Sequence, residues 1–281
     1  MELDGILVIR KPEGMTSFDV IARLRKKYKQ KKFGHTGTLD PMASGVLVVM
    51  AGKACKILPY IQDTDKEYIA TLALGSQYDT DDVFGTLEKT QEANTAFDAD
   101  AILASFKGKL HQRVPKASAK KVNGKKLYDY LRADQEVPEI YSDVEVYDIE
   151  RLEADKNHPD DLRFRVACSS GTYIRSICRD FGEKTGNLAA MTSLVRTEAN
   201  GFTLDQADDL DAETHRLYPI AMMLDYPKIQ AENLDDIRNG KKIRLETDAD
   251  RVLMMDGETA LAIYDRMTPG RNVFASARGL W

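Results

Sequence analysis

Hydrophobic positions recur along the chain at two spacings, and these spacings predict an alternation of helices and strands. Apolar residues follow a helical period through residues 15–32: Phe18, Ile21, Leu24 and Tyr28. Thr16 and Asp19 stand at the spacing of a capping box, so the helix is expected to begin there. Residues 45–50 (GVLVVM) form a short, β-branched apolar run, which is typical of a buried strand.

Further elements follow from the same patterns. Residues 66–74 and 162–168 alternate between apolar and polar side chains and are predicted strands, the first running into an acidic loop. Residues 96–110 suggest a helix with an apolar stripe: Ile102, Leu103 and Phe106. A second helix is expected from Thr172, as its N-cap, to Gly186. Residues 112–132 form a basic extended segment with a turn at 123–124 and then a short helix.

The pattern changes near Tyr226 and Pro227, after which short strand-like segments dominate. We therefore expect two domains, residues 1–225 and a small unit of residues 226–281. Strand runs that alternate with helices of different lengths predict a mixed α+β fold rather than a regular parallel repeat.

Charge is distributed unevenly, although the net charge of −5 is modest. Residues 1–60 carry 11 basic and 5 acidic side chains, a net of +6, and residues 107–132 carry 9 and 1, a net of +8. Two basic segments on an otherwise acidic chain suggest a localised phosphate-binding surface, so RNA or DNA is a candidate partner. Solvated lysine runs are the alternative interpretation.

Cysteine content and hydropathy favour a cytoplasmic protein without a membrane partner. The three cysteines (Cys55, Cys168 and Cys178) show no metal-ligand spacing and are expected to be reduced thiols in the core. The longest apolar stretch is too short to span a bilayer, and acidic residues stand where a signal peptide would be basic.

Asp40 is the one carboxylate in the glycine-rich stretch GHTGTLDPMASG, residues 34–45. Asp before Pro is common at helix starts, and the stretch alone favours a cap or turn. The alternative is a nucleophile, because glycines allow close backbone approach and the segment leads into a buried strand. Arg175, at the start of the helix predicted over residues 172–186, is a candidate cation to keep the carboxylate ionised. Tyr68 and Tyr173 are candidate stacking platforms for an extruded base.

Four segments resemble, in order, the bacterial tRNA pseudouridine synthase TruB family: GHTGTLDPMASGVLVV, KEYIATLALGSQYDTDD, FKGKLHQRVPKASAKKVNGKKLYDYLR and CSSGTYIRSICRDFGEKTGNLAAMTSLVRT. The opening DGILVIRKPEGMTSFDV is similar to the KPxGxTS motif of that family. The resemblance is specific, since several spaced motifs agree, and it covers residues 3–205; the tail is similar to a small PUA-like domain.

The resemblance implies a mainly antiparallel sheet with flanking helices, the pseudouridine synthase catalytic fold, followed by a PUA-like RNA-binding domain. It further implies isomerisation of uridine 55 in the T loop of tRNA, by a monomer that uses no cofactor and no metal. Asp40 is then the nucleophile, Tyr68 stacks on the flipped uracil, and Arg175 pairs with the aspartate. The remaining implied positions bind substrate: Tyr173 and Leu194 as pocket walls, and His35 in the vacated T loop. Lys121 is a further candidate for binding substrate because it lies in a basic segment.

Three positions in two motifs depart from the family pattern, and two other function classes compete. Ala117 stands where the family usually has tyrosine, Val114 replaces a proline, and Cys55 replaces a threonine. A tRNA-folding chaperone without catalysis is one alternative, which the joint presence of Asp40, Tyr68 and Arg175 opposes. An aspartate-dependent phosphotransferase is the other; it would need acids for Mg²⁺, for which residues 79–82 (DTDD) are the candidates.

Overall fold

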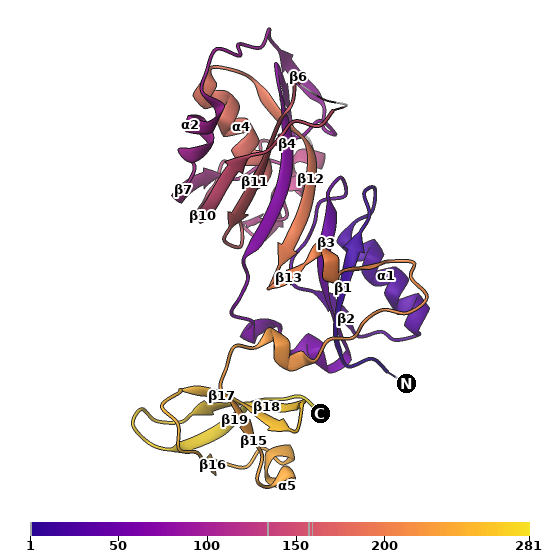
Figure 1. Cartoon of the computed structure of the whole chain (residues 1–281), viewed down its shortest axis with the longest axis vertical. Coiled ribbons are helices and arrows are strands. Elements are labelled where there is room, and N and C mark those ends of the chain that lie inside the picture. The colour runs from indigo at the N-terminus through magenta and orange to yellow at the C-terminus, as the bar shows by residue number, and fades with distance from the viewer. Residues whose placement is uncertain (1, 134, 157, 159) are drawn as a thin grey trace. The chain divides into compact units, whose positions relative to one another are not determined.

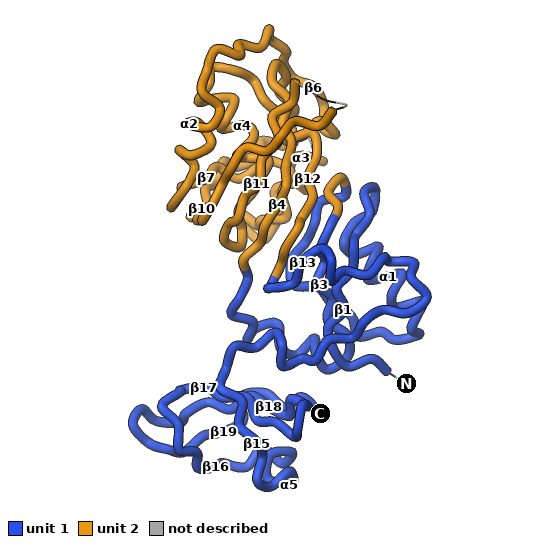
Figure 2. Tube along the Cα trace, in the orientation of Figure 1, with its two compact units in different colours: residues 1–41, 45–64, 200–281 blue, residues 42–44, 65–199 orange. Residues whose placement is uncertain are grey.

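The computed structural model describes residues 2–133, 135–156, 158 and 160–281, and the chain divides into two compact units (Figure 2). Unit 1 comprises residues 1–41, 45–64 and 200–281, and unit 2 comprises residues 42–44 and 65–199. The order of elements is drawn in Figure 1.

The N-terminal part of unit 1 is built on strand β3 (Ser44–Ala51), which is the predicted apolar strand. It pairs antiparallel with β1 (Gly5–Lys11) on one side and β2 (Phe33–His35) on the other. β14 (Asp208–Asp209) adds to β1 in parallel. Helix α1 (Ser17–Tyr28) packs on this sheet through a buried cluster: Leu7, Ile9, Val20, Ile21, Leu24, Leu47 and Val49.

Helix α1 confirms the predicted start but corrects its buried face. Thr16 is the N-cap and forms the full capping box with Asp19. Val20, Ile21 and Leu24 are buried, whereas Phe18 is 64% exposed. Phe18 lies outside the buried stripe of the helix, so its ring points to solvent. The Arg25 guanidinium lies 5.7 Å from the centroid of this ring.

Unit 1 also contains a second sheet and four short elements: η1 (Gly52–Tyr60), β13 (Phe202–Thr203), η2 (Leu204–Gln206) and η3 (Ile220–Met223). The second sheet has the order β15 (Lys228–Gln230), β17 (Arg251–Asp256), β18 (Thr259–Arg266), β19 (Val273–Gly279) and β16 (Ile243–Arg244). Helix α5 (Leu234–Arg238) covers a core of its own: Ile237, Val252, Met254, Tyr264 and Phe274. This confirms the expected β-rich C-terminal region, and the curled sheet is consistent with a PUA-like domain.

Unit 2 contains an antiparallel sheet in the order β12 (Ala189–Ala199), β4 (Lys66–Leu74), β11 (Leu162–Cys168), β10 (Tyr141–Arg151) and β7 (Gly108–Arg113). Helices α2 (Ala99–Ala104) and α4 (Ile174–Thr185) pack on it (Figure 1). Two hairpins complete the unit, β5 (Ser76–Tyr78) with β6 (Leu87–Thr90), and β8 (Lys121–Val122) with β9 (Lys125–Lys126). The predicted mixed, mainly antiparallel fold is confirmed.

Three local predictions in unit 2 have different outcomes. The turn at Asn123 and Gly124 is confirmed, because both residues have positive φ (51° and 80°), as a two-residue hairpin of type I′ requires, and the short helix α3 (Leu127–Arg132) follows. The helix predicted over residues 96–110 is too long, since Gly108 has φ 103° and opens strand β7. The N-cap of α4 is Tyr173 rather than Thr172, whose hydroxyl donates to the Ser169 carbonyl instead.

Candidate active site

The seven candidate residues are divided between the two units. Unit 1 holds Asp40 and His35, and unit 2 holds the other five: Tyr68, Lys121, Tyr173, Arg175 and Leu194. Each group is therefore described within its own unit.

Asp40 lies between two residues whose backbones are both anchored. The Leu39 N–H donates to the Ser17 hydroxyl oxygen (2.8 Å), and that hydroxyl donates to the Leu39 carbonyl (3.2 Å). The Pro41 carbonyl accepts from the Gly14 N–H at 2.8 Å. Since Ser17 and Leu39 are buried, these contacts fix the backbone on either side of the carboxylate.

Lys11, which is not among the seven candidate residues, holds the same loop. Its side chain is fully buried, and its ammonium donates to the carbonyls of Pro12 (2.8 Å), Met15 (2.6 Å) and Pro41 (3.3 Å). Burial of a charged group is costly unless it is well hydrogen-bonded. The KPEGMTS segment, residues 11–17, thus acts as a clamp on the loop that carries Asp40.

The local structure at Asp40 corrects the helix-cap interpretation. Asp40 and Pro41 lead through a turn at 41–42 into strand β3 instead of opening a helix. The backbone on either side of Asp40 is therefore held by the clamp, and Asp40 does not stand at a helix N-terminus. His35, expected in the loop, ends strand β2 opposite Val49, and the next residue, Thr36, donates from its hydroxyl to the Asn200 side chain (2.5 Å).

Tyr68 and Leu194 share one face of the unit 2 sheet. In the β12–β4 register, Leu194 stands opposite Ala70, and Arg196 stands opposite Tyr68. Directly opposed residues of an antiparallel pair lie on the same face, as do residues two apart in one strand. Tyr68 is 7% exposed and Leu194 6%, so both belong to a nearly dry surface.

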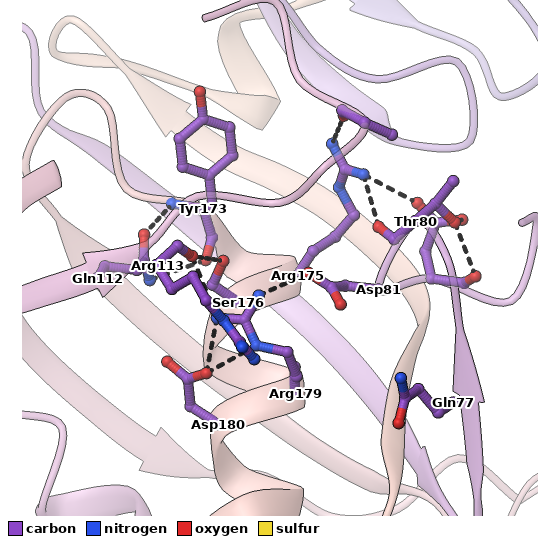
Figure 3. A network of polar contacts seen from close by, with 12 residues as sticks. Gln77, Thr80, Asp81, Gln112, Arg113, Tyr173, Arg175, Ser176, Arg179 and Asp180 are labelled. Carbon is purple, nitrogen blue, oxygen red and sulfur yellow. Dashed lines mark hydrogen bonds and ion pairs between the residues drawn. The ribbon is translucent and has the colours of Figure 1, made fainter. Parts of the chain in front are cut away.

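Arg175 is buried in the first turn of α4. Its Nη1 donates to the Thr80 carbonyl (2.7 Å), and its Nη2 donates to the carbonyl of Ala117 (3.0 Å) (Figure 3). The guanidinium also pairs with the Asp82 carboxylate at 3.4 Å, and only 6% of its side chain is exposed. The Ala117 backbone therefore serves Arg175 whatever side chain stands there.

Asp82 pairs with Arg175, although the acidic run that contains it was a candidate for binding Mg²⁺. Its Oδ1 accepts from the Thr80 hydroxyl and from the Phe84 N–H, both at 3.0 Å, which leaves Oδ2 for Arg175. Its neighbour Asp81 pairs with Arg179 at 2.7 Å. Across the residues that the structure describes, no three His, Cys, Asp or Glu side chains are grouped as metal ligands. The acidic run binds arginines, which counts against the phosphotransferase.

Tyr173 is held through its backbone at the start of α4. The Gln112 side chain accepts from the Tyr173 N–H (2.8 Å) and donates to its carbonyl (3.0 Å), as Figure 3 shows. Gln112 is 2% exposed and lies on β7. A rigid amide bridge thus sets the position of the tyrosine, while the ring is left to other contacts.

The basic segment of unit 2 combines lysines with aromatic rings. Lys121 is exposed on the β8–β9 hairpin, opposite Lys126. The Lys125 ammonium lies 4.3 Å from the centroid of Tyr130, and Lys126 lies 5.2 Å from that of Tyr128. Hairpin lysines held over tyrosine rings of the following helix α3 present both charge and stacking surface, which is the composition of an RNA-binding surface.

The fold is that of the pseudouridine synthases. The structure is similar to a solved chain of a Cbf5–Nop10–Gar1 complex, with a TM-score of 0.70 at 22% identity, covering 99% of this chain and 85% of that one. An archaeal box H/ACA Nop10–Cbf5 complex gives a TM-score of 0.67 at 21% identity. At these identities the likeness establishes the fold.

Sequence comparison identifies the family. Residues 25–174 match the model of the TruB family pseudouridylate synthase N-terminal domain. Proteins named tRNA pseudouridine synthase B are 38% identical in Oceanobacillus iheyensis (93% of this chain, 92% of the relative) and 38% in Bacillus subtilis (93% of each). The chain belongs to the TruB family of pseudouridylate synthases. Within the described part of the chain, every helix is too short or too polar to cross a membrane.

Proposed function

We propose that this enzyme isomerises uridine 55 in the T loop of tRNA to pseudouridine. The observation that carries the proposal is similarity over 93% of the chain to enzymes named tRNA pseudouridine synthase B. The basic β8–β9 hairpin, whose lysines lie over tyrosine rings of α3, supports an RNA substrate on physical grounds. A cytoplasmic, monomeric protein without cofactor or metal stays a prediction.

In this proposal Asp40 is the nucleophile, and the clamp of residues 11–17 holds its backbone in the reacting position. Tyr68 stacks on the flipped uracil, with Leu194 on the same face and Tyr173 as a further pocket wall. Arg175 pairs with Asp40 and keeps it ionised. His35 enters the T loop where the base has left, and Lys121 binds phosphate.

The chemistry balances without an added reagent. The C1′–N1 bond breaks, the uracil turns, and a C1′–C5 bond forms. The proton on C5 then leaves and a proton is gained at N1, so the reaction is redox-neutral. One carboxylate, a stacking surface and a water-excluding pocket are the required groups. Extruding the base costs roughly a few kcal/mol, which phosphate contacts and stacking offset.

Tritium release tests the proposal directly. Unmodified tRNA labelled at C5 of uridine should lose one equivalent of tritium with the wild-type enzyme, and none when position 55 is cytidine. Asp40→Asn should bind the tRNA with similar affinity but release no tritium. Release by Asp40→Asn would exclude Asp40 as the nucleophile. Tight binding by wild type without release would favour the chaperone.

We also propose that residues 226–281 form a PUA-like RNA-binding domain. Its own core and its own five-stranded sheet support a separate module. Charge reversal at the exposed Lys242 and Arg244 should then weaken tRNA binding without changing the rate of the bound complex. Unchanged affinity would leave the module without an RNA-binding role.

A further inference from the structure

The loop of residues 79–86, between β5 and β6, carries two of the groups that hold Arg175. The Thr80 carbonyl accepts from Arg175, and the Asp82 carboxylate pairs with it. The loop is internally braced, because the Thr86 N–H donates to the Asp79 carboxylate (2.7 Å) and the Asp79 N–H donates to the Thr86 carbonyl (3.1 Å). The position of the Arg175 guanidinium therefore depends on where this loop sits on α4.

Asp81 stands between those two residues and attaches the loop to α4 at a second point. Its carboxylate pairs with Arg179 at 2.7 Å, and 13% of its side chain is exposed. Arg179 is four residues beyond Arg175, so the two guanidinium groups project from the same face of the helix. The loop thus contacts one face of the helix through two arginines that lie one turn apart (Figure 3).

The backbone conformation and hydrogen bonds of Asp81 fix its position in the loop. Its φ is 63°, in the left-handed region that most residues avoid. Its N–H donates to the Tyr78 carbonyl, and its carbonyl accepts from the Met191 N–H, both at 3.2 Å. The left-handed turn lets Asp81 reach Arg179, while Thr80 and Asp82 on either side contact Arg175.

Arg179 is oriented by groups that do not belong to the loop. Its Nε donates to Asp180 (2.9 Å), and its Nη2 donates to the Arg113 carbonyl (3.1 Å). Only 11% of the side chain is exposed. Asp180 and the Arg113 carbonyl therefore hold the guanidinium against α4 and β7, and its Nη1 binds Asp81.

We propose that Asp81 and Arg179 are positioning residues for the isomerisation: their ion pair docks the loop of residues 79–86 on α4 and so aligns Arg175. The inference rests on the proposed function only for the role of Arg175. The Asp81–Arg179 pair acts through Arg175 and touches neither the base nor the sugar in this scheme.

The surroundings of Asp81 make the pair sensitive to pH. Burial raises the pKa of Asp81 above its usual 3.8, against the opposing effect of Arg179, Arg175 and Arg113. Burial likewise raises the pKa of Asp180. A cavity beside the pair is lined by further charged groups: Asp79, Glu88, Glu139, Arg113 and Lys116. The Asp81–Arg179 pair therefore breaks on acidification at a higher pH than an exposed pair would.

Activity is expected to fall on acidification. Above its raised pKa, Asp81 is ionised and the loop is docked, so Arg175 is aligned. As the pH falls through that pKa, Asp81 becomes neutral and wild type comes to resemble Asp81→Asn. For stability the sign is opposite: the raised pKa means that the free energy of unfolding contributed by Asp81 falls as the pH rises above 3.8.

The test compares Asp81→Asn with Asp180→Asn in the full-length enzyme under single-turnover conditions. Asparagine tolerates a left-handed backbone, so Asp81→Asn removes charge while keeping the turn. Asp180→Asn removes a carboxylate from the same guanidinium but leaves the loop attached. We expect Asp81→Asn to lower the rate of tritium release about ten- to a hundred-fold at neutral pH, with unchanged tRNA affinity.

Two further results distinguish positioning from general destabilisation. The rate ratio of wild type to Asp81→Asn should approach one as the pH is lowered, whereas Asp180→Asn should follow wild type throughout. Arg179→Lys, which cannot serve Asp81, Asp180 and the Arg113 carbonyl together, should also lose rate without affinity. This variant decides the matter if Asp81→Asn does not fold.

The inference and the proposed function can fail separately. An active wild type with equal rates for Asp81→Asn and Asp180→Asn, or a ratio independent of pH, would overturn the positioning role alone. A wild-type enzyme that releases no tritium from uridine 55 would overturn the proposed function. Equal losses of rate in both variants would show a structural network instead of a docking pair.

Discussion

At the scale of single residues, Ser17 offers the sharpest test of how Asp40 is held. Its hydroxyl satisfies both backbone groups of Leu39 and is 1% exposed. Ser17→Ala leaves these groups unpaired, at a cost of about 1–3 kcal/mol of unfolding free energy. We expect the single-turnover rate to fall about ten-fold or more, with tRNA affinity retained, because the loop loses its fixed position.

Ser105 provides the matched control for this substitution. Its hydroxyl also donates to a backbone carbonyl, that of Ile102 (2.7 Å), but on the exposed end of α2. Ser105→Ala should leave both the rate and the affinity near wild type. If Ser17→Ala is as active as Ser105→Ala, the clamp does not position the carboxylate.

Candidate site residues could be chosen from the sequence only where their neighbours along the chain signal a role. Asp40 lies in a recognisable glycine-rich motif, and Arg175 follows a recognisable turn. Ser17 and Lys11 contact residues 22 and 30 positions away, so nothing local to them indicates that they hold a loop. The acidic run of residues 79–82 suggests Mg²⁺ ligands, but Asp82 pairs with Arg175, because the same sequence pattern can bind a metal ion or an arginine.

At the scale of elements, periodicity predicted the strands and helices that bury one face. β11 and α1 were confirmed because their apolar spacing is set by packing on one face, and β3 was confirmed from its continuous apolar run because nearly the whole strand is buried. The helix over residues 96–110 failed because Phe106 is buried beyond the helix end, so its spacing imitated another turn. Thr172 failed as a cap because its hydroxyl is used by the preceding turn.

The β8–β9 hairpin carries a prediction about RNA binding. The double variant Lys121→Glu and Lys125→Glu should weaken tRNA binding and lower the slope of log K against log salt by about two. The reason is that each lost phosphate contact removes the release of roughly one counterion. The rate of the bound complex should change little, since these lysines bind rather than react.

A double reversal at exposed lysines elsewhere in unit 2, Lys89 and Lys156, is the control. It changes the net charge of the protein by the same amount, so it corrects for long-range attraction of tRNA. Equal salt slopes for the two double variants would show that the hairpin makes no specific phosphate contacts.

At the scale of the whole molecule, the C-terminal sheet poses the question of how independently the proposed domain folds. Its core residues all come from the stretch between Ile229 and Phe274. Other contacts join it to the rest of unit 1: the Lys56 ammonium donates to the Trp281 carbonyl (2.7 Å), and the Arg251 guanidinium lies near the rings of both Tyr60 and Tyr226 (5.1 and 5.5 Å). A separate core favours independent unfolding, and these contacts favour coupling.

Calorimetry of Phe274→Ala decides between the two. Phe274 is fully buried, and its truncation costs about 3–5 kcal/mol. Because its core is self-contained, we expect two thermal transitions, of which only one moves to lower temperature, with the single-turnover rate of the bound tRNA preserved below that transition. The matched variant Leu24→Ala, in the core of α1, should move the other transition. If either variant shifts both transitions together, residues 226–281 are not a separate folding domain, because the contacts of Lys56, Tyr60 and Arg251 then couple the two cores of unit 1.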